Sequence, residues 1–320
     1  MRNFRLFGAL ALCAVMMPSL TSCSDDDDDK GGDGTGGVLE IEGERLSYIS
    51  GTYGTYTLDY DSKGRVSTVS NSYGDLDINY SKGTITISQN GSSEDTQQYK
   101  VKFNDRGYIT ELASSWSETY TDDGDRYQLK GSGTVKFSYN GSGYMTTVSS
   151  SMSETEKDLG TGESERFTES YTTKLTWTNG NLVKAVCKGS ENEGGDKESY
   201  SETYDVDYST TANAYLQNPV AISEIANDDT EWNVLAAAGL FGKGPKMLPR
   251  CVSETDDDGY SNTTNVSYTL NSVGSISTER IGYTTYNYNY EDVDSRAADF
   301  GEAKPFAGGR RFFVKGSRRR

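Results

Sequence analysis

The chain has 320 residues, a formal net charge of −17 and 33% hydrophobic residues. It contains no histidine, which excludes Ser-His-Asp and Cys-His nucleophile systems and any His-ligated metal site. An acidic body repels phosphate groups, so nucleic acid is not an expected partner.

The N-terminus has the form of a signal peptide, residues 1–22. Arg2 and Arg5 precede an apolar stretch that is too short to span a membrane. Residues 20–23, LTSC, resemble the lipobox of bacterial lipoproteins, in which the signal is cleaved before the Cys and the Cys is lipidated. The resemblance implies a lipid anchor on Cys23. The alternative is an ordinary secretory cleavage that leaves Cys23 free.

An acidic run follows the lipobox directly, at Asp25, Asp26, Asp27, Asp28 and Asp29. It resembles the export signal of Bacteroidetes-type lipoproteins, where acidic residues after the lipidated Cys send the protein to the outer face of the outer membrane. The alternative is a solvated spacer. With the Gly-rich residues 31–37, the segment 23–38 is expected to be a flexible, lipidated tether.

Residues 58–69, LDYDSKGRVSTV, have the pattern of a strand, a tight turn and a second strand. Asp61 is placed to cap the following amides, and Gly64 to take the left-handed conformation that closes a type I turn with a bulge. This hairpin recurs along residues 39–290, and apolar residues alternate with polar ones in long segments such as 125–139. Such alternation indicates antiparallel strands with one dry face.

The predicted fold is therefore all-β, a long antiparallel β-meander curled into a barrel-like or half-barrel sheet. The expected strands are residues 45–50, 53–60, 65–70, 75–80, 84–89, 96–103, 108–120, 125–139, 144–155, 165–177, 181–188, 197–208, 251–255, 260–270 and 275–290. An aromatic residue precedes most of the Gly-containing turns at one end of this meander. One helix is expected at residues 228–241, where Trp232 and Leu235 give an apolar side that would cover the dry face.

Two resemblances rest on these motifs. Residues 60–66, YDSKGRV, resemble a YD (RHS-type) repeat, a wall-building hairpin of secreted shells. The lipobox, the acidic run, the hairpin array and residues 240–249, LFGKGPKMLP, together resemble Bacteroidetes surface lipoproteins that carry a domain of unknown function with a porin-like fold. That resemblance implies a curled, barrel-like sheet and supplies no catalytic residues. A membrane-spanning barrel is not expected, because Gly, Thr and Ser lie between the aromatics of the dry faces.

Candidate sites are few. Cys187 and Cys251 either form one disulfide in an oxidising envelope or remain free thiols. Residues 256–259, DDDG, lack the ligand spacing of a calcium loop and are interpreted as an acidic hairpin turn, as are residues 122–124. No metal or cofactor is expected.

The last predicted strand carries an aromatic ladder, Tyr283, Tyr286, Tyr288 and Tyr290. It can stack on sugar rings or form part of the core. The tail, residues 291–320, is basic and is expected either to contact acidic groups or to be disordered.

We therefore expect a lipid-anchored protein of the outer membrane, exposed at the cell surface, that binds a glycan or a protein without catalysis. A structural envelope lipoprotein without a ligand is the alternative. A glycan-active enzyme, which would need a pair of facing carboxylates, is the third hypothesis.

Overall fold

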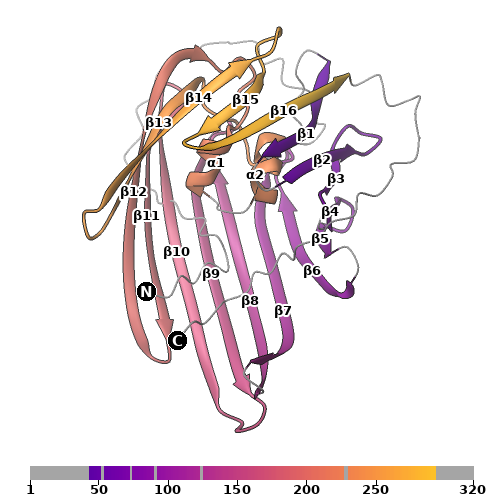
Figure 1. Ribbon diagram of the computed structural model, residues 1–320, viewed down its shortest axis with the longest axis vertical. Coiled ribbons are helices and arrows are strands. Elements are labelled where there is room, and N and C mark those ends of the chain that lie inside the picture. Colours follow the sequence, from indigo (N-terminus) through magenta and orange to yellow (C-terminus); the bar gives the residue numbers. More distant parts are fainter. Residues whose placement is uncertain are drawn as a thin grey trace.

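The alternating strands close into a sixteen-stranded antiparallel barrel (Figure 1). The computed structural model describes residues 43–292 except 52–53, 73, 90–91, 123–124 and 227–229. Each strand pairs with its neighbours in sequence, and β16 closes the barrel on β1. The expected barrel-like meander is confirmed, and it is closed. The signal peptide, Cys23, the acidic run, the tether and the tail after residue 292 lie outside the described residues.

The first eight strands are β1 (Glu44–Gly51), β2 (Gly54–Tyr60), β3 (Val66–Ser70), β4 (Gly74–Asn79), β5 (Thr84–Gln89), β6 (Ser92–Phe103), β7 (Ile109–Asp122) and β8 (Asp125–Tyr139). The others are β9 (Met145–Asp158), β10 (Ser164–Thr178), β11 (Asn181–Glu193), β12 (Asp196–Ala212), β13 (Met247–Asp256), β14 (Ser261–Leu270), β15 (Ile276–Ile281) and β16 (Thr284–Asp292). The expected single strand at 275–290 is wrong. Gly282, with φ of +56°, and Tyr283 form a turn that divides it into β15 and β16.

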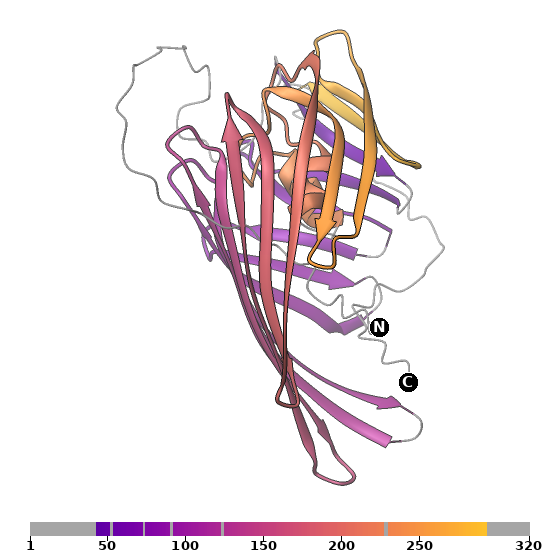
Figure 2. The ribbon, with the colours of Figure 1, turned by 90° about the vertical axis from the view of Figure 1, so that its left-hand side faces the viewer.

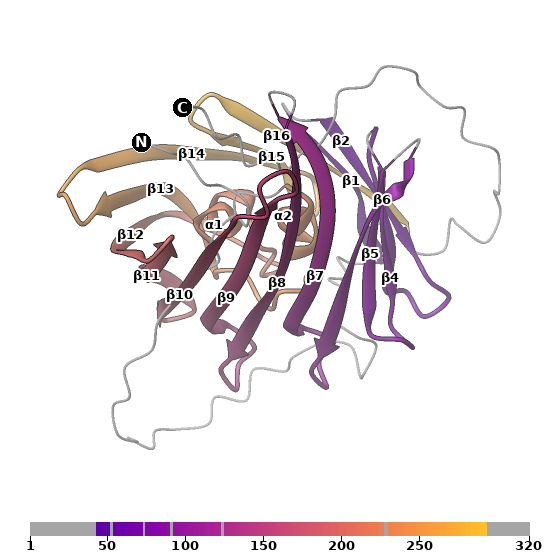
Figure 3. The ribbon, with the colours of Figure 1, turned by 90° about the horizontal axis from the view of Figure 1, so that it is seen from below.

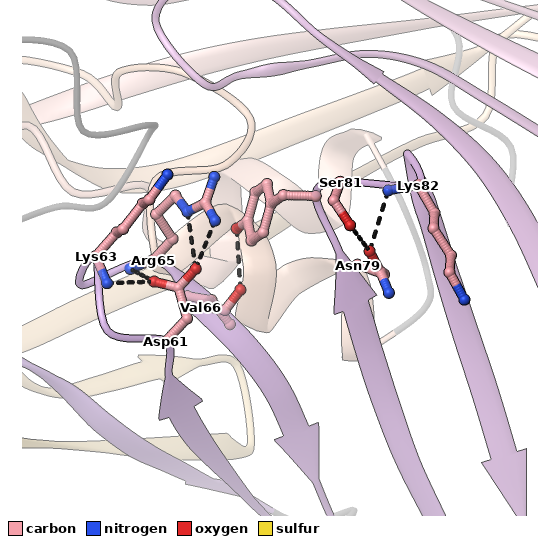
Figure 4. A network of polar contacts seen from close by, with 8 residues as sticks. Asp61, Lys63, Arg65, Val66, Asn79, Ser81 and Lys82 are labelled. Atoms are coloured by element: carbon pink, nitrogen blue, oxygen red, sulfur yellow. Dashed lines mark hydrogen bonds and ion pairs between the residues drawn. The ribbon is translucent and has the colours of Figure 1, made fainter.

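The predicted turn chemistry is confirmed at Asp61 (Figure 4). Its carboxylate accepts the amides of Lys63 and Arg65 at 2.9 and 3.0 Å. Gly64, with φ of +76°, donates its amide to the Asp61 carbonyl. In the same way, the side chain of the first turn residue accepts a hydrogen bond from the amide of the residue four positions later at Asn104, Asn140, Asp256 and Asn271. Residues 256–259 thus form the expected acidic hairpin turn.

The aromatic residues before the turns have a common structural role. In the described part of the chain, six even-numbered strands carry a Tyr or Trp at or near their C-terminal end that donates to a backbone carbonyl near the start of the preceding strand. These bonds, 2.5 to 2.9 Å long, join Tyr60 to Leu46, Tyr80 to Val66, Tyr139 to Ile109, Trp177 to Met145, Tyr208 to Leu182 and Tyr290 to Ile276. We call them the aromatic clamps. They tie together the strand ends at one rim of the barrel.

Two short helices, α1 (Val220–Ala226) and α2 (Thr230–Ala237), fill the interior near this rim (Figures 1 and 3). The expected helix at 228–241 is thus shorter, because Gly239 leaves helical geometry with φ of +93°. We call these two helices, with the turn that follows α2, the helical plug. Leu235 and Leu240 are buried against the inward side chains of the strands, so the helical plug covers the dry face as expected.

Helix α1 was not predicted, because its N-terminus is stabilised by a residue distant in sequence. The carboxylate of Glu279, on β15, is fully buried and accepts the amides of Val220 and Ala221 at 2.7 and 2.9 Å. It also accepts the hydroxyls of Tyr268 and Tyr288. Burial raises the pKa of Glu279, and the four donated bonds offset part of the cost of burying the carboxylate and fix the plug to the wall.

The wall is uneven in height. Strands β1 to β5 have 5 to 8 residues, whereas β7 to β12 have 13 to 17. The long strands extend far beyond the helical plug on one side of the barrel (Figures 1 and 2). Their inner face beyond the plug is therefore the part of the interior that the helices do not fill.

Polar and charged side chains cover the outside of the barrel. On β8, for example, the outward residues include the exposed Lys130 and Lys136. The exposed large hydrophobic residues of the described chain are Leu159, Tyr260, Leu270 and Tyr283, which lie in turns or at a strand end. The described surface therefore lacks the continuous apolar band of a lipid-facing barrel.

Candidate ligand-binding face

Charges are divided between the two faces of the long strands. Residues that lie opposite each other in the pairing share a face, which assigns each side chain of β7–β13 to the inside or the outside. The inward carboxylates include Glu118, Glu154, Glu156, Asp158, Glu165, Glu169, Glu191, Glu193, Asp196, Glu198, Glu202, Glu254 and Asp256. Every Lys and Arg in the described residues of these strands lies on the outer face: Arg126, Lys130, Lys136, Lys157, Arg166, Lys174, Lys184, Lys188, Lys197 and Arg250. We call the inward side chains of β7–β13 the acidic inner face.

Carboxylates on this face are aligned across neighbouring strands. Glu191 on β11 is paired with Glu169 on β10 and with Glu198 on β12. Glu156 and Glu165 are likewise opposite each other on β9 and β10. Like charges directly opposite in an antiparallel sheet are destabilising, so this arrangement has a cost to the fold.

Aromatic rings alternate with the carboxylates. Next to the Glu169–Glu191–Glu198 row, Tyr200 lies across Gly189, where an added Cβ would be 2.2 Å from the ring. In the same way Trp116 lies across Gly131, where an added Cβ would also be 2.2 Å from the ring. These two glycines are thus required for the rings to lie flat on the sheet. Both rings are half-buried.

Hydrogen bonds join the rings to the carboxylates. Their donors are Tyr or Trp and their acceptors are Glu: Trp116 to Glu154 at 3.1 Å, Tyr120 to Glu156 at 2.6 Å, Tyr200 to Glu169 at 2.8 Å and Tyr204 to Glu202 at 2.9 Å. Each bond uses one acceptor position of a carboxylate and holds that carboxylate beside the ring.

The electrostatics of the face follow from this crowding. Burial raises the pKa of the Glu169 carboxyl, and the nearby Glu191 raises it further, while the Tyr200 hydroxyl acts in the opposite direction. Burial also raises the pKa of Glu191, together with the charges of Glu198 and Glu193. The neighbouring negative charges that disfavour ionisation of these carboxyls would stabilise a cation placed between them.

The carboxylates are spread along the strands. The described residues contain no group of three or more Cys, Asp or Glu side chains arranged to hold a metal ion. The acidic inner face therefore presents an extended negative surface instead of a single metal centre.

No helix among the described residues is long and apolar enough to cross a membrane.

Cys187 and Cys251 are not disulfide-bonded in the structure. Cys187 lies on the inner face of β11 and is buried, whereas Cys251 on β13 is directed to the outer side, where its Sγ is 3.8 Å from Asp207 Oδ2. Strand β12 separates them, so the structure has no disulfide at this pair.

Two of the four rings of the tyrosine ladder belong to the core. Tyr286 and Tyr288 are 3% and 5% exposed and belong to the core, and the Tyr290 hydroxyl is bonded to Gln217 and Ile276. Tyr283 lies alone in the β15–β16 turn, fully exposed. The prediction of ligand stacking is therefore wrong for Tyr286 and Tyr288, because β16 turns their rings toward the helical plug.

The acidic inner face was missed at the sequence level, although a signal was present. In residues 197–208, Glu198, Tyr200, Glu202 and Tyr204 alternate with other residues and share one face. Scoring alternation by charge as well as by hydrophobicity places Glu198 and Glu202 with the rings and Lys197 on the opposite face.

Comparisons with known proteins show a distant likeness in fold. No protein-family model and no curated protein matches the sequence. Among solved structures, a porin-like protein from Bacteroides vulgatus ATCC 8482 is 13% identical, with a TM-score of 0.48, over 77% of this chain and 98% of that one. A porin-like protein from Bacteroides uniformis ATCC 8492 is 18% identical, with a TM-score of 0.42, over 80% and 95% of the two chains. At this distance the likeness bears on neither activity nor location.

Proposed function

We propose that this chain is a lipid-anchored envelope protein whose acidic inner face binds a basic, extended segment of another protein. The observation that carries the proposal is the separation of charge on β7–β13: every Lys and Arg of the described residues lies outside, and the inner face carries carboxylates without a Lys or Arg. A row of opposed glutamates is costly to the fold, and such costs are typical of binding sites.

A basic peptide matches both components of the face. Lysine and arginine pair with carboxylates, and their cationic heads are attracted to the faces of Trp and Tyr rings. A neutral glycan would use the rings, such as Tyr200 over Gly189, but would gain nothing from many aligned negative charges. The charges therefore favour a cationic protein segment over a glycan, and binding needs no catalytic group.

The proposed anchor is the lipid on Cys23, with Asp25, Asp26, Asp27, Asp28 and Asp29 as the export signal to the cell surface. Acyl chains would hold the membrane, so the barrel itself needs no lipid-facing band. The charged outer face of the described strands supports this division of roles.

Calorimetry tests the binding. The Cys23→Ser protein, which cannot be lipidated, is titrated with a Lys/Arg-rich decapeptide, a Glu-rich decapeptide and a neutral oligosaccharide. We expect binding of the basic peptide alone, weakening as salt rises because exposed charges are screened. Replacing Glu169, Glu191 and Glu198 together by Gln should weaken it at least tenfold.

The matched control removes the same number of charges from the outer face, by Asp59→Asn, Asp77→Asn and Asp205→Asn. This control should bind the basic peptide nearly as well as the parent. Equal losses in both variants would mean non-specific attraction to a net negative protein and would refute the site. Binding of the oligosaccharide alone would favour the glycan hypothesis, and no binding at all would favour the structural one.

Cell fractionation and protease shaving test the anchor and the export signal. Cys23→Ser should release the protein from the membrane fraction. Replacing Asp25–Asp29 by Ala should leave it membrane-bound but protected from protease on intact cells. If the parent protein is itself protected, the surface location is wrong and the partner is to be sought in the periplasm.

A further inference from the structure

Two arginines at the rim of the aromatic clamps show how this protein combines an aromatic ring with a carboxylate. The Cζ of Arg65 lies 3.9 Å from the centroid of the Tyr80 ring. The same guanidinium pairs with Asp61, with Nη2 2.6 Å from Oδ2 (Figure 4). In a second group, the Cζ of Arg45 lies 4.3 Å from the centroid of the Tyr60 ring, and its Nε pairs with a carboxylate of β16 at 3.1 Å. Each guanidinium thus contacts a ring and a carboxylate at the same time.

A ring beside carboxylates also occurs on the acidic inner face, at Tyr200. The ring lies across Gly189 on the next strand, and its hydroxyl donates to Glu169 on the strand beyond. Glu198, two residues before Tyr200, is exposed and shares the same face. Because one side of the ring lies on the glycine, its other side is turned to the interior of the barrel, beside Glu198. We call these four residues the Tyr200 unit.

Trp116 forms a second unit with the same arrangement. Its ring lies across Gly131 on the next strand, and its indole nitrogen donates to Glu154 on the strand beyond. Glu118, two residues after Trp116, is exposed and shares the same face. Since β7 and β12 run in opposite directions, the exposed carboxylate of each unit lies on the side of its ring that is further from the clamp rim. We call these four residues the Trp116 unit.

We propose that each unit is a subsite for an arginine of the bound basic segment, an inference that rests on the proposed function. The guanidinium stacks on the interior side of the ring and pairs with the exposed carboxylate, as Arg65 does with Tyr80 and Asp61. The inner face of the described residues of β7–β13 carries no Lys or Arg, so this guanidinium comes from outside these strands. Arginine is favoured over lysine because its planar, weakly hydrated head group can stack and pair at once, whereas an ammonium is a compact, strongly hydrated charge.

The strand pairing gives the spacing of the two subsites. Gly131 and Gly189 are three strands apart, which corresponds to about 14 Å across the sheet. Along the strands, Gly131 is level with Glu154 and, through the registers of β9–β10 and β10–β11, with Glu193, four residues from Gly189. Four residues correspond to about 13 Å, so the two rings are about 20 Å apart. An extended segment covers this length in about six residues, and residues six apart in such a segment face the same side.

Three decapeptides of equal charge test the subsites. Decalysine is compared with a peptide that carries arginine at its second and eighth positions and with one that carries arginine at its second and fifth positions. Calorimetry with the Cys23→Ser protein measures each affinity. We expect the peptide with arginines six apart to bind about tenfold more tightly than decalysine, roughly threefold for each ring. The peptide with arginines three apart can place only one of them on a ring and should gain about threefold.

Ring variants test which side chains select arginine. Tyr200→Leu combined with Trp116→Leu removes both rings and keeps every carboxylate, so it should abolish the gain from arginine with a much smaller change in the affinity for decalysine. Tyr283→Leu is the control, because it removes a fully exposed ring from the β15–β16 turn and should leave all three affinities unchanged. Circular dichroism verifies that the variants are folded, and the comparison of the three peptides on the parent protein does not depend on them.

Each failure has a distinct result. Equal binding of the three peptides by the parent protein would overturn the arginine subsites and leave the proposed function standing. Equal gains from the two arginine peptides would contradict the spacing of the two units. An arginine gain that persists in the folded double variant would mean that the carboxylates alone select arginine, which also contradicts the proposal. The absence of binding by all three peptides would refute the acidic inner face as a binding site, and the subsites with it.

Discussion

At the scale of single residues, the choice of tyrosine over phenylalanine at the strand ends has a physical reason. Tyr139, for example, packs its ring into the core and donates its hydroxyl to the Ile109 carbonyl at 2.6 Å. Burial raises the pKa of this hydroxyl well above its ordinary value, so it remains a donor at any physiological pH. Each clamp thus gives a backbone carbonyl near a strand start a hydrogen-bond donor from the side chain.

Tyr139→Phe should lower the free energy of unfolding by about 1–2 kcal/mol, because it leaves the Ile109 carbonyl without this donor. Urea unfolding followed by fluorescence measures the change. The control is Tyr283→Phe, which removes the same hydroxyl from a fully exposed ring and should have no measurable effect. Equal losses in the two variants would contradict the structural role of the clamp.

At the scale of elements, the long hairpins depend on glycines beneath rings. Gly189 on β11 lies under the ring of Tyr200 on β12, so the two residues form one packing unit. A β-branched residue would ordinarily favour a strand, and here it would displace the ring. Glycine at position 189 thus allows the Tyr200 ring to pack on the sheet, at the loss of the higher strand propensity of a β-branched residue.

A double-mutant cycle tests this unit. Gly189→Val alone should destabilise the protein by about 1–3 kcal/mol, because its side chain overlaps the Tyr200 ring. In a Tyr200→Ala background the same change should be neutral or stabilising, since the overlap is gone and valine favours strands. Additive effects in unfolding measurements would mean that the ring does not need the glycine.

The helical plug is attached to the wall through one buried carboxylate. Glu279→Ala should lower the free energy of unfolding by about 3 kcal/mol, because four donors lose their acceptor. Glu279→Gln should cost less, since one amide oxygen can still accept. Asp59→Ala, on the exposed outer face, is the control and should change stability by less than about 0.5 kcal/mol.

At the scale of the whole molecule, local patterns predicted most of the architecture. Period-two alternation and the Asp61-type turns were sufficient for a meander with one dry face, because both are local properties of the chain. The closure of β16 on β1, the division of residues 275–290 and helix α1 depend on contacts between distant residues. Glu279 and Val220 are 59 residues apart, and no local pattern predicts their bond.

The candidate site also depends on closure. Acidic residues at alternate positions of one strand form a continuous acidic face only when the neighbouring strands pair with it in the matching register. Glu191 faces Glu169 and Glu198 because three strands align by pairing. The inner face then brings together negative charges from adjacent strands that isolated hairpins would leave apart.

This collected charge makes stability depend on pH in a direction that can be predicted. The pKa values of Glu169 and Glu191 are raised in the folded state above the ordinary 4.5, so the folded protein binds these protons more readily than the unfolded chain. Their contribution to stability is therefore fully present below pH 4.5 and is lost as the pH rises through the raised values.

Glu169→Gln with Glu191→Gln should accordingly raise the melting temperature at pH 7, while the gain disappears below about pH 4, where the parent carboxyls are protonated. Asp59→Asn with Asp77→Asn, on the exposed outer face, is the control and should not show this gain. A basic peptide bound at the face should stabilise the parent at pH 7 more than the Gln variant, since it neutralises charges that the variant lacks. A gain that persists unchanged at pH 4 would mean that packing, and not charge, limits the stability of this face.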